Sequence, residues 1–417
     1  MRNFLILALI FVSLAVKAQH LRYDQHIDSI TYKYYLNGDW NRLIDTTKQA
    51  IKNNIDFKHL RQRLGYTYFV KGDYYAAQSQ YEKALAFDHT DITTRNYLYY
   101  CSLYSGNESN ARYRGGLLTD ELKTINKLKP FKIISAVDVE YNYKGNDNSK
   151  RGNPTYIRAG INTQLGYRLN LYQSFSTYRQ KNVSTYQESG VLIPVQTRDS
   201  ASIRQNEYFA LLNWTITPHL SWNVGFHNLN SNVHAIYTYS YRLNSKQVKT
   251  VTDTTLNFPG NLFSTKFTYT FNRFDIGLSG SVFSYNSIVT QQYGVHVGII
   301  LPGKMNIYLK SSLYGMTDTQ NNNRLIFTQK AGALLLKKLW TEGEITLGNL
   351  NNFSDNNGMY IYNSLDPTTF RSGLTLFWNI LPKLTLFGNY TYDKKLIEED
   401  KTNYNQHSFS GGIIWKL

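Results

Sequence analysis

From Phe131 to the C-terminus, apolar and polar residues alternate with a period of two. Clear examples are Phe263–Phe271, Gln292–Ile300 and Leu384–Tyr392. Alternation puts one set of side chains on each face of a strand, and a tilted transmembrane strand needs about ten residues. The pattern predicts an antiparallel transmembrane β-barrel over 130–417. With strands of this length the barrel would have about 14 strands, and counts of about 12 or 16 also fit.

The segments between these strands fall into two classes that alternate along the chain. Short turns lie at 217–219, 272–274, 301–304, 337–339 and 380–383, and longer polar segments lie at 144–155, 187–203, 231–260, 317–324, 351–369 and 394–403. Outer-membrane barrels have short turns on the periplasmic side and long loops outside. With an even number of strands, both ends of the barrel are expected on the periplasmic side, and the N-terminal domain in the periplasm.

The last strand, His407–Leu417, alternates to the final residue. A closed barrel in lipid can end on an apolar strand because its last strand pairs with its first. This end resembles the C-terminal assembly signal of bacterial outer-membrane barrels, which the barrel assembly machinery reads. The residues in its slots are Ser410, Gly412, Trp415 and Leu417.

The polar positions of the strands carry charges of both signs, which are expected to face the lumen. They are Asp138, Glu140, Arg158, Arg168, His227, Lys266, His296, Lys310, Glu344 and Arg371. A hydrated channel for a polar solute can be lined in this way. A narrow barrel can instead fill its lumen with paired charges, because buried charges must be paired. Asp138 and Glu140 on the first strand could pair with arginines of the second.

The N-terminal part of the chain has a different period. Gly38, Gly72 and Gly106 are 34 residues apart, and each precedes Asp or Asn. A 34-residue period is typical of tetratricopeptide repeats. The middle unit resembles that family through Leu64-Gly65, Tyr68, Ala77, Tyr81 and Ala84. The sequence therefore predicts a helical domain of about three repeats over 19–129.

Two ladders share this period. Tyr32, Tyr66 and Tyr100 form one, and Asp28, Gln62 and Asn96 form the other. By the resemblance they lie on the concave face, where they could bind an extended peptide or stack on the sugar rings of a polysaccharide. The alternative is that the tyrosines pack between repeats.

The first 18 residues combine Arg2, an apolar run and a small-residue site before Gln19, which is typical of a cleaved signal peptide. The run is shorter than the roughly 20 residues of a membrane-spanning helix. Cys101 is the only cysteine, so the chain can form no intramolecular disulfide.

Composition and charge agree with an exported barrel. The chain has 35 Tyr, 21 Phe and 6 Trp, and a formal net charge of +16. The basic residues are spread along an exported chain, so lipopolysaccharide or an anionic polymer is a better counter-charge than nucleic acid. The sequence contains no phosphate-binding loop, paired-histidine zinc motif or nucleophile elbow. We therefore expect no catalysis, metal or cofactor.

A signal peptide, periplasmic repeats and a C-terminal barrel together resemble the outer-membrane exporters of surface polysaccharides and the YaiO-type outer-membrane proteins. The resemblance implies an outer-membrane protein of a Gram-negative bacterium that exports or passes a polar polymer or solute. The alternative is a non-conducting anchor whose repeats recruit a partner for envelope assembly.

Overall fold

The computed structural model describes residues 24–417 except 149, 189–194, 244–245, 304 and 398–400. The expected signal peptide lies outside the described residues. The chain divides into two compact units, Met1–Leu128 and Lys129–Leu417. The first is helical and the second is a closed barrel.

Antiparallel helix pairs build the first unit. Its helices are 24–37, α2 (Trp40–Lys52), α3 (Lys58–Val70), α4 (Tyr74–Phe87), α5 (Ile92–Tyr104), α6 (Glu108–Gly116) and α7 (Asp120–Ile125). The 34-residue period appears as the same turn three times. Gly38, Gly72 and Gly106 each have a positive φ, which glycine adopts without steric cost. The next residue then caps the following helix through its side-chain oxygen.

Aromatic rings fill the space between these helices. Tyr81 of α4 is fully buried and stacks on Tyr97 of α5 with ring centroids 5.0 Å apart. Its ring lies over Gly65 of α3, where a Cβ would come within 3.1 Å of it. The small residue therefore allows α3 and α4 to approach. Among the described residues, no helix is long and apolar enough to cross a membrane.

The second unit is a closed antiparallel barrel in which the last strand pairs with the first. The expected fold class and the expected number of about 14 strands are confirmed. The barrel strands are β1 (Phe131–Asn146), β2 (Thr155–Leu165), β3 (Leu169–Glu188), β4 (Val195–Thr215), β5 (Leu220–Leu243), β6 (Lys246–Phe271), β7 (Phe274–Tyr285), β8 (Ile288–Ile300), β9 (Tyr308–Asp318), β10 (Asn323–Leu336), β11 (Leu339–Leu347), β14 (Thr368–Leu381), β15 (Leu384–Ile397) and β16 (Thr402–Lys416).

Alternation along the strands separates an apolar outer face from a polar interior. Leu374, Leu376 and Trp378 point outward and are exposed to between 42% and 54%. Near the short turns, Trp222 stacks on Phe267 and lies beside Trp214, as in the aromatic girdles of membrane barrels. An apolar outer band around a polar interior is the architecture of Gram-negative outer-membrane proteins.

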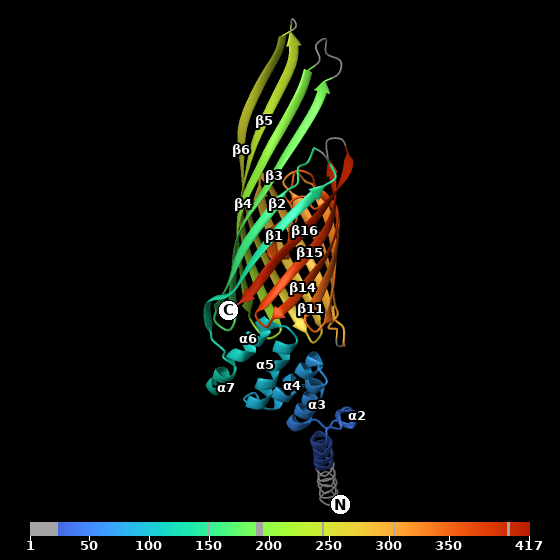
Figure 1. The fold of residues 1–417 in the computed structure, drawn as a ribbon. Coiled ribbons are helices and arrows are strands. Elements are labelled where there is room, and N and C mark those ends of the chain that lie inside the picture. The colour runs from blue at the N-terminus through green and yellow to red at the C-terminus, as the bar shows by residue number, and fades with distance from the viewer. Residues whose placement is uncertain (1–23, 149, 189–194, 244–245, 304, 398–400) are drawn as a thin grey trace, which may run out of the picture. The chain divides into compact units, whose positions relative to one another are not determined.

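Strands β3 to β6 continue well past the other strands at the end of the barrel that carries the longer connections (Figure 1). This extension corrects the expectation of loops at 187–203 and 231–260, most of which is paired strand. The sequence there contains many Thr, Ser, Asn and Tyr residues, because neither face of a strand beyond the bilayer meets lipid. The apolar alternation that marks a membrane strand is therefore absent.

Candidate functional site

Residues 348–367, between β11 and β14, fold into the barrel rather than outward; we call them the inward segment. They contain β12 (Ser354–Asp355), the short helix η1 (Asn356–Gly358) and β13 (Tyr360–Ile361), which pairs with β12. Polar contacts join the segment to β1, β4, β5, β6, β7, β8, β10, β14, β15 and β16. It therefore crosses the lumen and touches its wall on every side.

The tip of the inward segment is fixed through its backbone. The Gly358 carbonyl contacts Nδ1 of His227 at 2.8 Å, and the Asn357 carbonyl accepts a hydrogen bond from Ser264 at 2.6 Å. Gln292 bonds both the backbone N–H and the carbonyl of Ser354, at 3.0 and 2.9 Å. Because backbone groups make these contacts, they fix the path of the segment more than the identity of its side chains.

Apolar side chains hold the first part of the inward segment. Leu350 and Phe353 are almost fully buried against Met316 of β9 and Ile326 of β10. Further along the wall, Ile361 packs on a cluster formed by Leu229 of β5, Leu262 of β6 and Phe283 of β7. The segment is thus anchored by packing as well as by polar bonds.

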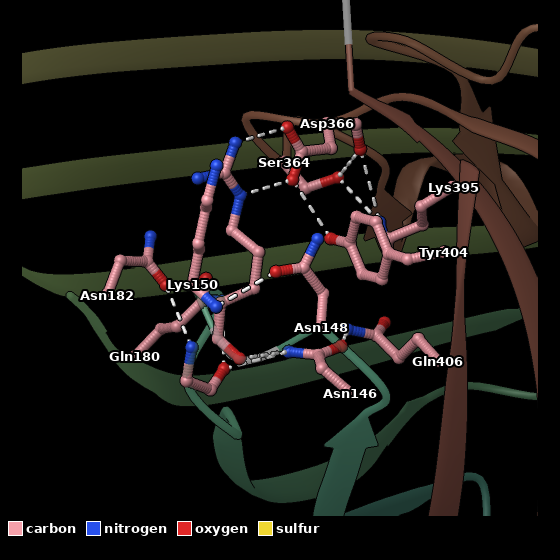
Figure 2. Close-up of polar contacts among 12 residues, drawn as sticks. Asn146, Asn148, Lys150, Gln180, Asn182, Ser364, Asp366, Lys395, Tyr404 and Gln406 are labelled. Atoms are coloured by element: carbon pink, nitrogen blue, oxygen red, sulfur yellow. Dashed lines mark hydrogen bonds and ion pairs between the residues drawn. The ribbon is translucent and has the colours of Figure 1, made fainter. Parts of the chain in front are cut away.

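Asp366 anchors the end of the inward segment, and Figure 2 shows the polar side chains that surround it. Its carboxylate accepts hydrogen bonds from Arg151 at 2.6 and 2.9 Å and from the Tyr404 hydroxyl at 2.9 Å. The Lys395 ammonium donates to the Asp366 carbonyl and to the Ser364 hydroxyl. Asp366 is only 5% exposed. A bidentate arginine on a buried carboxylate is among the stronger polar contacts that a protein makes.

Ion pairs on the wall continue into the inward segment. Arg158 lies 3.1 Å from Asp138 and 2.9 Å from Glu140, and Glu140 accepts a further bond from the Tyr360 hydroxyl of the segment. On the other side, Lys330 lies 2.6 Å from Glu344 and 3.6 Å from Asp355 of the segment. Glu140 and Lys330 therefore each contact both the wall and the inward segment.

Most of the charged residues expected in the lumen lie there. Asp138, Glu140 and Arg158 form the three-residue cluster described above. Glu344 and Arg371 form a second network with Asp393. His227 contacts the inward segment, while Lys266 and Lys310 line a cavity beside it and His296 is buried nearby.

Arg168 departs from this expectation. Strand β2 ends at Leu165 because Gly166 takes a positive φ and begins the turn to β3, so Arg168 lies in that turn and is exposed. Only one of the two expected arginine partners of Asp138 and Glu140 therefore reaches them.

A cavity of about 410 Å³ lies next to the tip of the inward segment. Strands β6 to β11 and residues of β12 and η1 line it, and its lining is rich in hydroxyl, lysine and carboxylate groups. Lys266 and Lys310 lie near the ends of β6 and β9 that carry the short turns. The cavity is therefore on the short-turn side of the segment.

In the helical unit, the two ladders mainly make contacts between neighbouring repeats. Asp28 accepts from Arg63 at 2.8 Å, and Arg63 also lies over the Tyr32 ring. Gln62 donates to Asp91 and Thr94 of the next repeat at 2.8 and 2.9 Å. Asp28 and Gln62 of the polar ladder therefore bond to the neighbouring repeat.

The tyrosines of the other ladder also make contacts within the helical unit. Tyr66 makes edge contacts with Tyr35 and Tyr97, and Tyr100 donates to Asn126. The Asn96 side-chain oxygen is buried without a hydrogen-bond partner among the described residues. Tyr32 remains about half exposed, at 49%, and is the ladder ring most open to a partner.

The four residues of the expected assembly signal lie on β16 or directly after it. Trp415 and Leu417 point outward and are 53% and 46% exposed. Gly412 faces inward beneath the ring of Phe387, which occupies the space that a Cβ would need. Ser410 bonds to Asn142 of β1. The four residues thus help to close the barrel through contacts with both neighbours of β16.

Sequence reasoning missed the inward segment and its anchors Asp355, Tyr360 and Asp366. The segment has the polar, asparagine-rich composition of an external loop, so it was expected among the long loops at 351–369. A signal was present in Leu350, Phe353 and the run 360–362, since bulky apolar and aromatic residues are unusual in a solvated loop.

No family model matches the sequence, and no curated protein matches it. Among solved structures, the chain is similar to a bacterial polysaccharide outer membrane secretin, with 8% identity over 69% of this chain and 99% of the other and a TM-score of 0.38. It is similar to the CymD monoaromatic hydrocarbon channel, with 8% identity over 73% and 93% and a TM-score of 0.43. It is also similar to a Pseudomonas aeruginosa FadL homologue, with 6% identity over 73% of this chain and 92% of the other and a TM-score of 0.41.

Proposed function

We propose that this protein is an outer-membrane transport barrel for a polar solute, in which the inward segment closes the lumen at rest. The observation that carries the proposal is the ring of polar contacts between residues 348–367 and the wall. Hydrogen bonds and ion pairs of this kind can be exchanged for bonds to water or to a polar solute. Their net contribution is about 0.5–1.5 kcal/mol each, or somewhat more for charged groups, so a closed segment can still be displaced.

The composition of the wall supports a polar rather than an apolar solute. Behind the inward segment the wall presents Arg158, Lys330 and Arg371 together with their carboxylate partners. An apolar solute would have to pass these charges without satisfying any of them. A polar polymer or solute can replace their bonds one at a time.

We further propose that the helical unit consists of tetratricopeptide-type repeats in the periplasm, where it holds a protein partner or guides a polysaccharide toward the barrel. The supporting observations are the 34-residue recurrence of the glycine turn and the exposed ring of Tyr32. Export of a surface polysaccharide is the specific form of transport that we propose for this arrangement.

Conductance in a planar bilayer tests the transport role. A variant in which 349–366 are replaced by a short Gly-Ser linker should give large, steady channels, whereas the unaltered protein should conduct little. Replacing the external turn 319–322 by a linker of the same kind is the control and should leave conductance low. A linker variant that inserts normally but stays closed would contradict the proposal.

The closed lumen also favours a second function, that of a non-conducting outer-membrane anchor whose helical unit recruits an envelope partner. That function predicts a stable complex with a periplasmic protein, and no conductance even after removal of the inward segment. Affinity purification from intact envelopes, combined with the bilayer measurement above, separates the two functions.

A further inference from the structure

We infer that the cavity beside the inward segment binds an oxyanion, a carboxylate or phosphate group, between Lys266 and Lys310. This inference rests on the proposed transport role, because it names the chemical class of the solute. The cavity of about 410 Å³ is large enough for such a group with part of the molecule that carries it.

Two lysines lie close together in the lining of this cavity. Lys266 comes from β6 and Lys310 from β9, both line the cavity, and their side chains lie within hydrogen-bonding reach of each other. A lysine ammonium has three donors and no acceptor. Two ammonium groups at this distance repel each other, and an anion between them would turn that repulsion into two attractive contacts.

Two of the three carboxylates that line the cavity, Asp355 and Glu342, have other partners. Asp355 pairs with Lys330 at 3.6 Å, and Glu342 accepts a hydrogen bond from the Tyr308 hydroxyl. Asp275 lies 3.7 Å from Nε2 of His296. Asp275 and Asp355 are near enough to attract Lys266. Within the described part of the chain, however, no carboxylate lies within ion-pair distance of either cavity lysine.

Further donors surround the same space. The hydroxyls of Ser279 and Ser312 line the cavity together with the lysines. His296 is 3% exposed, and its Nε2 has no hydrogen-bond partner among the described residues. Among the described residues, the two lysines have no ion pair with a carboxylate, and the His296 ring nitrogen near them has no hydrogen bond, although Asp275 lies 3.7 Å from it. A bound group would complete the site. Oxyanions have several acceptor positions and meet this requirement.

The position of the cavity gives the site a role in transport. Because it lies on the short-turn side of the inward segment, an anionic solute entering from that side would reach the lysines before the segment. Ser264, whose hydroxyl bonds the Asn357 carbonyl, also lines the cavity. The bound solute would therefore lie directly against the tip that closes the lumen.

Isothermal titration calorimetry on the full-length protein in detergent tests the site with two probes, inorganic phosphate and glucuronate. We expect saturable binding of at least one probe, and at least a tenfold loss of affinity in the double variant Lys266→Gln, Lys310→Gln. The control Lys337→Gln, Lys338→Gln removes the same charge from a short turn that does not line the cavity, and it should bind as the unaltered protein does. Tighter binding of phosphate would indicate a phosphorylated solute, and tighter binding of glucuronate an acidic sugar.

Thermal unfolding gives a second measurement that does not depend on the binding heat. Phosphate or glucuronate should raise the Tm of the unaltered protein and of the control, but not that of the double variant. Without added anion, Lys266→Gln alone should raise the Tm, because it removes the repulsion from Lys310. Absence of binding by the unaltered protein, or equal binding by the double variant, would overturn the inference.

Neither measurement requires conduction. Anion binding that persists when the linker variant fails to conduct would refute the transport role and leave the site standing. Conduction by the linker variant without anion binding would refute the anion site and leave the transport role standing.

Discussion

The Asp366 anchor should control how often the inward segment leaves the wall. The substitution Asp366→Ala removes the acceptor of two Arg151 hydrogen bonds and of the Tyr404 hydroxyl. It removes the carboxylate that pairs with Arg151, and the side chain of Arg151 is only 11% exposed. Because the lysine contacts of this region go to the Asp366 carbonyl and to Ser364, they survive the substitution.

The free-energy cost of this substitution follows from the burial of the Arg151–Asp366 pair. Removing one partner of a buried ion pair costs about 3–5 kcal/mol. Arg151 lies at the rim of the barrel and regains water when the segment is released, so the lower value applies. A cost of about 3 kcal/mol corresponds to a roughly 100-fold increase in the released population, since about 1.4 kcal/mol is a factor of ten.

Hydrogen exchange measured by mass spectrometry reports this population directly. Peptides covering 348–367 should exchange roughly 100-fold faster in the Asp366→Ala variant, because local opening limits exchange there. Asp147→Ala is the control: it removes a carboxylate at the same end of the barrel that bonds Asn405 rather than the segment. The double variant Arg151→Ala, Asp366→Ala should open less than the two single effects combined, because the two side chains form one unit. Unchanged exchange, or additive effects, would refute the reasoning.

Three further predictions concern the helical unit. Gly65→Ala places a methyl group within 3.1 Å of the buried Tyr81 ring and should destabilise the unit by about 1–3 kcal/mol through overpacking, seen as a lower Tm in the helical circular dichroism signal. Burial raises the pKa of the Cys101 thiol to about 12, so iodoacetamide at pH 8 should leave it unmodified until denaturant is added; rapid labelling of the folded protein would contradict its burial. A hydrogen bond from Lys58, followed by those from Thr90, lowers the pKa of Asp88 from 3.8 to about 2. That pair therefore stabilises the fold above pH 3.8 and less as the pH falls toward 2, so a Tm deficit of Asp88→Asn measured at pH 6 should disappear near pH 2; a deficit that is constant with pH would count against it.

Features that depend on regular repetition could be predicted from the sequence. Each lipid-facing strand must alternate, and each helix pair must turn at a glycine such as Gly72, so the barrel and the helical unit leave periodic signals. The pairing of Arg158 with Glu140 also follows, because adjacent strands bring these two positions opposite each other.

The path of the inward segment across the lumen could not be predicted in the same way. It is the path of one segment without sequence periodicity, residues 348–367. Local sequence does not distinguish an asparagine-rich loop in water from one that is hydrogen-bonded to a polar wall. The contacts of Asp366 and Tyr360 join residues that are far apart in the chain, such as Tyr360 and Glu140. Only the closed barrel brings them together. The turn at Gly166 shows the same limit on a smaller scale, since one backbone angle moved Arg168 out of its expected strand.

Both ends of the inward segment are covalently joined to the barrel wall, since β11 and β14 are hydrogen-bonded neighbours. A released segment therefore cannot diffuse away, and it returns to its contacts at an effective concentration set by its own short length, on the order of millimolar. Reclosing should be a first-order process whose rate is independent of protein concentration and needs no second component. Each opening would then be brief and self-limiting, which would protect a cell that exposes such a barrel to its surroundings.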